Sequence, residues 1–77
     1  MAYSNEVFGL NLMYWRKKAH MTQDQLADVT KIDKNSIARY ETGGTCPGFD
    51  KVCMLADALG VSIDALSGLE PAAGDAA

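Results

Sequence analysis

Apolar residues recur along this chain at the three- and four-residue spacing of helices, in segments separated by short polar turns. In the first segment, about residues 5 to 19, the residues on one stripe are Phe8, Leu12, Trp15 and Ala19. Further helices are predicted at about Gln23 to Thr30, Lys34 to Thr42, Phe49 to Leu59 and Ile63 to Ser67. No segment alternates as a β-strand does. The pattern predicts an all-α, five-helix domain over residues 1–68, followed by a flexible tail at 69–77.

Capping residues mark where the second and third helices begin. Thr22 and Gln25 have the spacing of a capping box, in which each side chain bonds the backbone N–H of the other residue. Asp33 is a favourable N-cap for the next helix. Only Lys31 and Ile32 separate the second helix from this cap. We therefore expect a sharp turn between two short helices.

The third predicted helix divides into two sides when its residues are placed at about 100° intervals. The side suited to a core holds Ile37, Tyr40 and Glu41, and the polar side holds Asn35, Ala38, Arg39 and Thr42. A carboxylate at a buried edge needs a partner, and the planar guanidinium of Arg16 can hold Glu41 bidentately. We predict this structural ion pair. Two short helices across a tight turn, the second with a polar face, are typical of proteins that present a helix to the major groove of DNA.

The net charge of −3 weighs against a nucleic-acid partner, but the charges are unevenly distributed. Residues 14–45 hold six basic and four acidic side chains, a balance of +2, whereas the rest holds one basic and six acidic, a balance of −5. This asymmetry favours a DNA-facing half and a solvating half. The chain has no signal-peptide pattern and no apolar run of about 18 residues. We expect a cytoplasmic protein with no membrane partner.

Nothing in the sequence indicates an enzyme, a cofactor or a metal site. It contains no histidine-paired nucleophile, no carboxylate pair in a predicted cleft and no phosphate-binding loop. Cys46 and Cys53 have no second cysteine pair and no neighbouring histidine, and His20 is the only histidine. We expect Cys53 in the core and Cys46 in a more exposed loop, with a disulfide between them as a minor alternative.

The stretch from Phe8 to Leu66 resembles the Cro/repressor (XRE-type) helix-turn-helix family of phage and bacterial regulators. The matching residues are Phe8, Gly9, Leu12, Trp15, Arg16, Met21, Thr22, Gln23, Leu26, Ala27, Ile37, Glu41, Gly43, Pro47 and the run ALGVSIDAL from Ala58 to Leu66. The resemblance implies a five-helix domain that binds double-stranded operator DNA as a homodimer, usually to repress transcription. It also implies the Arg16–Glu41 pair.

By position, the resemblance assigns DNA contacts to two groups of residues. The expected base contacts are Lys34, Asn35, Ala38 and Arg39. The expected phosphate contacts are Thr22, Gln23, Thr42, Gly43 and Thr45. Basic side chains suit guanine, asparagine suits adenine, and a small residue can meet a thymine methyl group. The alternative is that this face is an ordinary solvated helix surface.

The chain departs from the family pattern at the turn and in the loop that follows the third helix. Lys31 stands where the family usually has Gly, so a left-handed backbone there would cost about 1 kcal/mol, unless the turn differs. His20 likewise stands where Gly often ends the first helix. The loop GGTCPG, residues 43–48, lacks the basic residues that relatives often place there. We therefore expect DNA binding that is weak or needs another protein.

A second apolar stripe on the first helix lies where the family usually carries charge, and its residues are Val7, Leu10, Met13 and Tyr14. Exposed apolar patches often mark a partner surface. The stripe is either a homodimer contact or a docking site for another protein, unless the tail or the fifth helix covers it. The alternative function is accordingly a protein-interaction module of the same fold, of antitoxin or antirepressor type.

Overall fold

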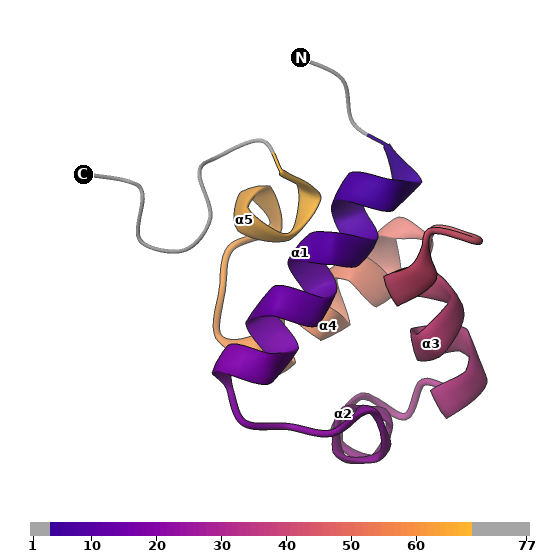
Figure 1. Cartoon of the computed structure of the whole chain (residues 1–77). Coiled ribbons are helices and arrows are strands. Elements are labelled where there is room, and N and C mark those ends of the chain that lie inside the picture. Colours follow the sequence, from indigo (N-terminus) through magenta and orange to yellow (C-terminus); the bar gives the residue numbers. More distant parts are fainter. Residues whose placement is uncertain (1–3, 69–77) are drawn as a thin grey trace.

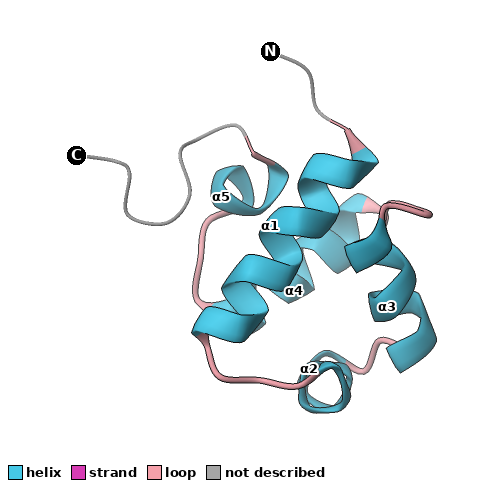
Figure 2. Ribbon diagram, viewed as in Figure 1, coloured by secondary structure: helices cyan, strands magenta, loops and turns pink. Residues whose placement is uncertain are grey.

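The computed structural model describes residues 4–68, whose helices follow one another in the predicted order (Figures 1 and 2). They are α1 (Asn5–Lys18), α2 (Gln23–Thr30), α3 (Lys34–Thr42), α4 (Phe49–Leu59) and α5 (Ile63–Ser67). Within this range all regular structure is helical, which confirms the all-α, five-helix class. The predicted tail at 69–77 lies outside the described residues.

The predicted caps form as short-range hydrogen bonds. The Gln25 amide donates to Thr22 Oγ1 at 3.0 Å, and the Thr22 amide donates to Gln25 Oε1 at 2.8 Å, which completes the capping box. The Asn35 amide donates to Asp33 Oδ2 at 2.9 Å. These bonds satisfy N–H groups that a helix start leaves without intrahelical partners. The boundaries of α2 and α3 therefore follow from local chemistry.

The first helix ends earlier than predicted, at Lys18 rather than Ala19. His20 has φ 60°, a left-handed conformation that turns the chain out of the helix. Ala19 is exposed, so its predicted place on the core stripe is wrong. Phe8 and Leu12 of that stripe are fully buried, whereas Trp15 is only half-buried.

The core joins side chains from all five helices. Its largest fully buried members are Phe8, Leu12, Leu26, Ile37, Leu55 and Leu66. Helix α1 packs against α3 and α5, and α2 packs against α3 and α4. Gly9 allows α1 to approach α3 closely, because a Cβ atom there would lie 2.7 Å from the carbonyl oxygen of Glu41. This close approach positions α3 against the rest of the domain.

None of the described helices combines the length and apolar character needed to cross a lipid bilayer.

Candidate nucleic-acid interface

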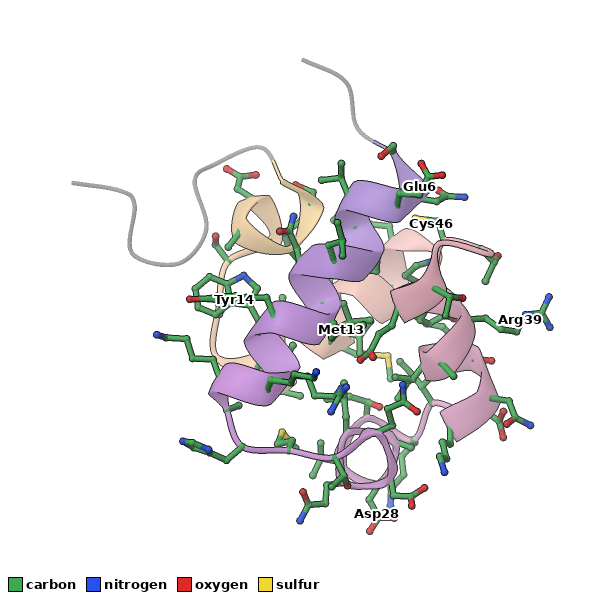
Figure 3. The ribbon with its side chains drawn as sticks, in the orientation of Figure 1. Glu6, Met13, Tyr14, Asp28, Arg39 and Cys46 are labelled. Carbon is green, nitrogen blue, oxygen red and sulfur yellow. The ribbon has the colours of Figure 1, made fainter. Side chains whose placement is uncertain are left out.

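The outer face of α3 is accessible, as its amphipathic pattern predicts. Lys34, Asn35 and Arg39 are exposed, and Ala38 beside them is half-buried. Figure 3 shows the Arg39 side chain projecting away from the body of the molecule. The opposite side of α3 is buried and consists of Ile37, Tyr40 and Glu41. The predicted division into a core side and a polar side is therefore confirmed.

The turn between α2 and α3 adopts the left-handed backbone that the family pattern requires, although no glycine is present. Lys31 has φ 63° and ψ 22°, and its amide donates to Ala27 O at 2.8 Å. The strain is thus borne by a lysine whose side chain is exposed. Of the two alternatives left open for Lys31, the structure supports a left-handed turn in which the strain is tolerated.

Thr30 also fixes this turn, which the sequence pattern did not reveal. Its buried hydroxyl donates to Leu26 O at 2.7 Å and accepts from the Ile32 amide at 3.3 Å. A threonine in the last turn of a helix can bond the carbonyl four residues earlier. That local preference is the only signal by which the role of Thr30 could have been recognised.

The predicted ion pair of Arg16 and Glu41 forms and is buried. Arg16 Nε lies 2.6 Å from Glu41 Oε2, and Arg16 Nη2 lies 3.1 Å from Glu41 Oε1. The Arg16 and Glu41 side chains are 11% and 2% exposed. Arg16 Nη1 donates to Met21 O at 2.8 Å, so the same guanidinium also holds the α1–α2 connection. The pair ties α1, the connection and α3 into one unit.

Gln23 reaches the same carboxylate, which was not foreseen. Its Nε2 donates to Glu41 Oε1 at 3.0 Å. One of the two amide hydrogens is therefore engaged, while the other and the Gln23 backbone N–H at the start of α2 can serve another acceptor. Thr22 accepts a hydrogen bond from the Gln25 amide and keeps its own hydroxyl proton to donate. The phosphate contacts expected of Thr22 and Gln23 stay predictions.

Several donors at the end of α3 and just after it already bond to carbonyl oxygens of α3. The Gly43 amide donates to Tyr40 O at 3.2 Å, and the Gly44 amide donates to Arg39 O at 3.0 Å. The Thr42 hydroxyl also donates to Arg39 O, at 3.1 Å. The phosphate contacts predicted for Thr42 and Gly43 would have to replace or share these bonds. The contact predicted for Thr45, which is half-buried, stays a prediction too.

A shallow hollow of about 310 Å³ lies between α3 and the start of α4. Its lining residues are Ser36, Arg39, Tyr40, Thr45, Cys46, Pro47, Gly48 and Lys51. Lys51 of α4 and Arg39 of α3 both line this hollow. Along the sequence Lys51 lies outside residues 14–45, in the part of the chain whose net charge is −5, because the order of residues does not show which of them the fold brings together. Lys51 therefore places a cation beside the loop at residues 43–48, which itself has no basic residue.

An exposed ion pair stands at the other end of α3. Lys34 Nζ lies 3.5 Å from Asp24 Oδ1 of α2, and the two side chains are 54% and 74% exposed. Pairs this exposed contribute about 0–1 kcal/mol to stability. Because the pair is weak and exposed, Lys34 can release Asp24 and pair with another anion.

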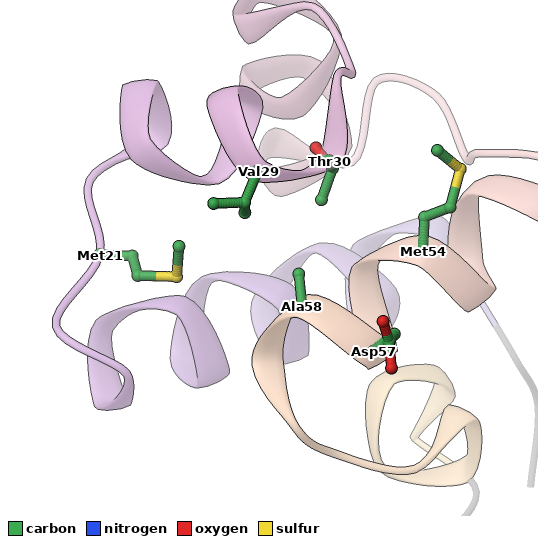
Figure 4. Close-up of a pocket in the computed structure, with 6 residues that line it drawn as sticks. All are labelled: Met21, Val29, Thr30, Met54, Asp57 and Ala58. Atoms are coloured by element: carbon green, nitrogen blue, oxygen red, sulfur yellow. The ribbon is translucent and has the colours of Figure 1, made fainter.

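Apolar side chains are exposed away from the polar face of α3. On α1, Leu10 is 65% exposed and Val7 is 38% exposed, whereas Met13 and Tyr14 are half-buried. Val29 and Met54 line a groove of about 340 Å³ between α2 and α4, together with Met21, Thr30, Asp57 and Ala58 (Figure 4). Phe49, at the start of α4, is also exposed.

The two cysteines do not join in a disulfide. Cys53 is half-buried, so its predicted place in the core is only partly correct, and Cys46 is half-buried as well. Within the described range, no group of three or more His, Cys, Asp or Glu side chains is placed to hold a metal ion.

Comparison with known proteins identifies a family over most of the chain. Residues 12–66 match the helix-turn-helix family HTH_3. A stretch of 53 residues is 42% identical to the cryptic phage CTXphi transcriptional repressor RstR of Vibrio cholerae serotype O1 (strain ATCC 39315 / El Tor Inaba N16961). The match covers 69% of this chain and 47% of the repressor, so the chain spans about half the length of that curated relative.

Solved structures share the fold. The restriction-modification controller protein C.AhdI of Aeromonas hydrophila superimposes with a TM-score of 0.77 over 80% of this chain and 94% of its own, at 24% identity. A transcriptional regulator of Listeria innocua superimposes with a TM-score of 0.73 over 88% of this chain and 64% of its own, at 28% identity.

Proposed function

This chain belongs to the helix-turn-helix family HTH_3, and from that premise we propose that it is a DNA-binding transcriptional regulator that inserts α3 into the major groove. The observation that carries the proposal is the accessible polar face of α3 on a helix anchored by its buried side. The 42% identical relative is named as a transcriptional repressor, which favours repression as the outcome of binding.

The proposed base contacts come from one side of α3. Lys34 and Arg39 offer donors to guanine, Asn35 can pair with adenine, and Ala38 can meet a thymine methyl group. The exposure of Lys34, Asn35 and Arg39 supports their roles, because these base contacts require side chains that reach beyond the helix surface.

The proposed phosphate contacts flank that face on both sides. Thr22 and Gln23 stand at the start of α2, and Thr42, Gly43 and Thr45 follow α3. We add Lys51 to this group, because it lines the same hollow as Arg39 and Thr45. Phosphate contacts of this kind orient a protein on the duplex without reading its sequence.

The proposal is tested by fluorescence anisotropy with labelled duplexes from the region upstream of the gene. We expect specific binding to the wild type and none to the double variant Asn35→Ala and Arg39→Ala, because it removes two proposed base contacts. Both side chains are exposed and lie outside the core, so the variant should still fold. The matched control is Lys18→Ala, which removes a cation from the exposed end of α1. Absence of any binding at low salt would instead favour a protein-interaction module, for which the exposed Leu10 is the supporting observation.

A further inference from the structure

The hollow between α3 and the start of α4 is lined by groups that can bind an anion. Two basic side chains line it, Arg39 from α3 and Lys51 from α4, and both are exposed. Three hydroxyl-bearing residues, Ser36, Tyr40 and Thr45, line it as well, and none of its described lining residues is acidic. Cationic and neutral donors therefore share one hollow of about 310 Å³.

The charges of Arg39 and Lys51 are not neutralised within the fold. Neither side chain forms an ion pair with a carboxylate of residues 4–68, where both ion pairs join other residues. Asp50 stands at the edge of the hollow, because a Cβ atom on Gly48 would lie 3.2 Å from Asp50 Oδ1. Asp50 is not a lining residue, so two positive charges face the hollow and one negative charge stands beside it.

The wall behind these donors is fixed by packing and hydrogen bonds. Tyr40 is 6% exposed, and Pro47 is buried as well. The loop that carries Thr45 is fastened to the end of α3, where the Gly44 amide donates to Arg39 O at 3.0 Å. A wall that is already ordered lowers the entropic cost of binding a ligand.

A phosphate group matches this set of donors. A phosphate monoester carries a charge of about −1.5 to −2 at pH 7 and has three strong acceptor oxygens, so it can use several donors at once. Arginine binds phosphate bidentately, and lysine binds it as a point charge. The volume of the hollow lies at the lower end of the range of about 300–1,000 Å³ found for small-molecule sites. A phosphate with a small attached group is therefore the class of ligand that fits.

We propose that this hollow binds the phosphate group of a small phosphorylated molecule, which competes with DNA for the same side chains. The competition rests on the proposed function, in which Arg39, Thr45 and Lys51 contact the duplex. A ligand in the hollow engages both cations, so it removes their attraction for the DNA backbone. The bound molecule therefore releases the protein from DNA.

Calorimetric titration of the full chain with pyrophosphate, at constant ionic strength, tests the site without DNA. We expect saturable binding to the wild type. Arg39→Ala and Lys51→Ala should each weaken it about tenfold, because each removes a charge-assisted hydrogen bond. The matched control Lys18→Ala removes the same charge from the exposed end of α1 and should bind as the wild type does.

The acidic residue at the edge supplies a change of the opposite sign. Asp50→Asn should bind pyrophosphate a few-fold more tightly than the wild type, because it removes a negative charge beside the hollow. Circular dichroism on all variants verifies that the helices remain. Absence of saturable binding to the wild type, or an equal loss in Lys18→Ala and Lys51→Ala, overturns the proposed site.

A competition titration distinguishes a small ligand from a DNA phosphate as the occupant of the hollow. Pyrophosphate should displace the labelled upstream duplex from the wild type more strongly than sodium chloride of the same ionic strength does, and Lys51→Ala should lose this difference. If specific duplex binding shows no such difference, the competition is wrong and the proposed function stands. If pyrophosphate binds in calorimetry but no duplex binds, the site stands, whereas the proposed function and the competition are wrong.

Discussion

The inner and outer faces of α3 each carry one ion pair to a neighbouring helix, and the two pairs differ in burial, geometry and partners. On the inner face, Arg16 holds Glu41 through two hydrogen bonds, and both side chains are almost fully buried. On the outer face, Lys34 meets Asp24 through one contact of 3.5 Å between exposed side chains. The inner pair is part of the scaffold, whereas the outer pair is open to exchange with another anion.

This difference assigns separate tasks to the two faces of one short helix. The inner pair, with Gln23 bonded to the same carboxylate, fixes how α3 stands relative to α1 and α2. The outer face can then present polar side chains without contributing to stability. Changes on the inner face should therefore alter folding, and changes on the outer face should alter binding alone.

The largest effect is expected from breaking the inner pair. Glu41→Ala should lower the free energy of unfolding by about 3–5 kcal/mol, because it leaves the Arg16 guanidinium buried without its carboxylate. Urea denaturation followed by circular dichroism measures the change. The matched control on the outer pair, Asp24→Ala, should stay within about 1 kcal/mol of the wild type. If both variants lost the same free energy of unfolding, the inner pair would not stabilise the fold more than the outer pair does.

Variants of Asn35 on the outer face of α3 and of Lys51 on the neighbouring α4 should distinguish residues that read the base sequence from residues that bind phosphate. If the proposed function holds, Asn35→Ala should reduce discrimination between the target and a mismatched duplex by about 1–3 kcal/mol. Lys51→Ala should weaken binding to both duplexes and reduce the salt slope by about 0.9 per bound subunit. Anisotropy titrations over a range of salt concentrations measure both quantities. A sequence-dependent loss for Lys51→Ala would place that residue among the base contacts instead.

A smaller effect is expected at the turn that aims α3. Lys31→Gly should raise the free energy of unfolding by about 0.5 kcal/mol, because relief of the left-handed strain exceeds the added entropy of the unfolded chain. Thermal denaturation measures the shift. Lys31→Ala is the control, since it removes the charge and keeps the strain. A lower stability for the glycine variant would mean that the turn is not strained.

The smallest effect is expected from the outer pair itself. Asp24→Asn should change stability by less than about 0.5 kcal/mol, since exposed pairs contribute little. It should also strengthen DNA binding a few-fold at low salt, because it releases Lys34 and removes a negative charge that phosphates would repel. Unchanged binding at low salt would show that Asp24 lies away from the duplex.

Local patterns in the sequence were sufficient for the helices, the capping box and the two sides of α3. Caps and helical periodicity act within a few residues, so they can be recognised without knowledge of the fold. The Arg16–Glu41 pair was also predictable, because a carboxylate on the core side of a helix requires a partner and Arg16 was the best candidate. The end of α1 was missed by one residue, although the resemblance had marked His20 as a position where Gly often ends the helix, and its backbone is left-handed.

Only the tertiary structure decided which distant side chains meet. It brought Lys51 beside Arg39, joined Gln23 to Glu41, and left Leu10 uncovered while α5 reached Val7. These outcomes depend on how helices pack, and packing is set by the combined shape of the core rather than by any one segment. The sequence alone determined the helices and the polarity of their faces, whereas the packing determined which charges and apolar residues share a surface.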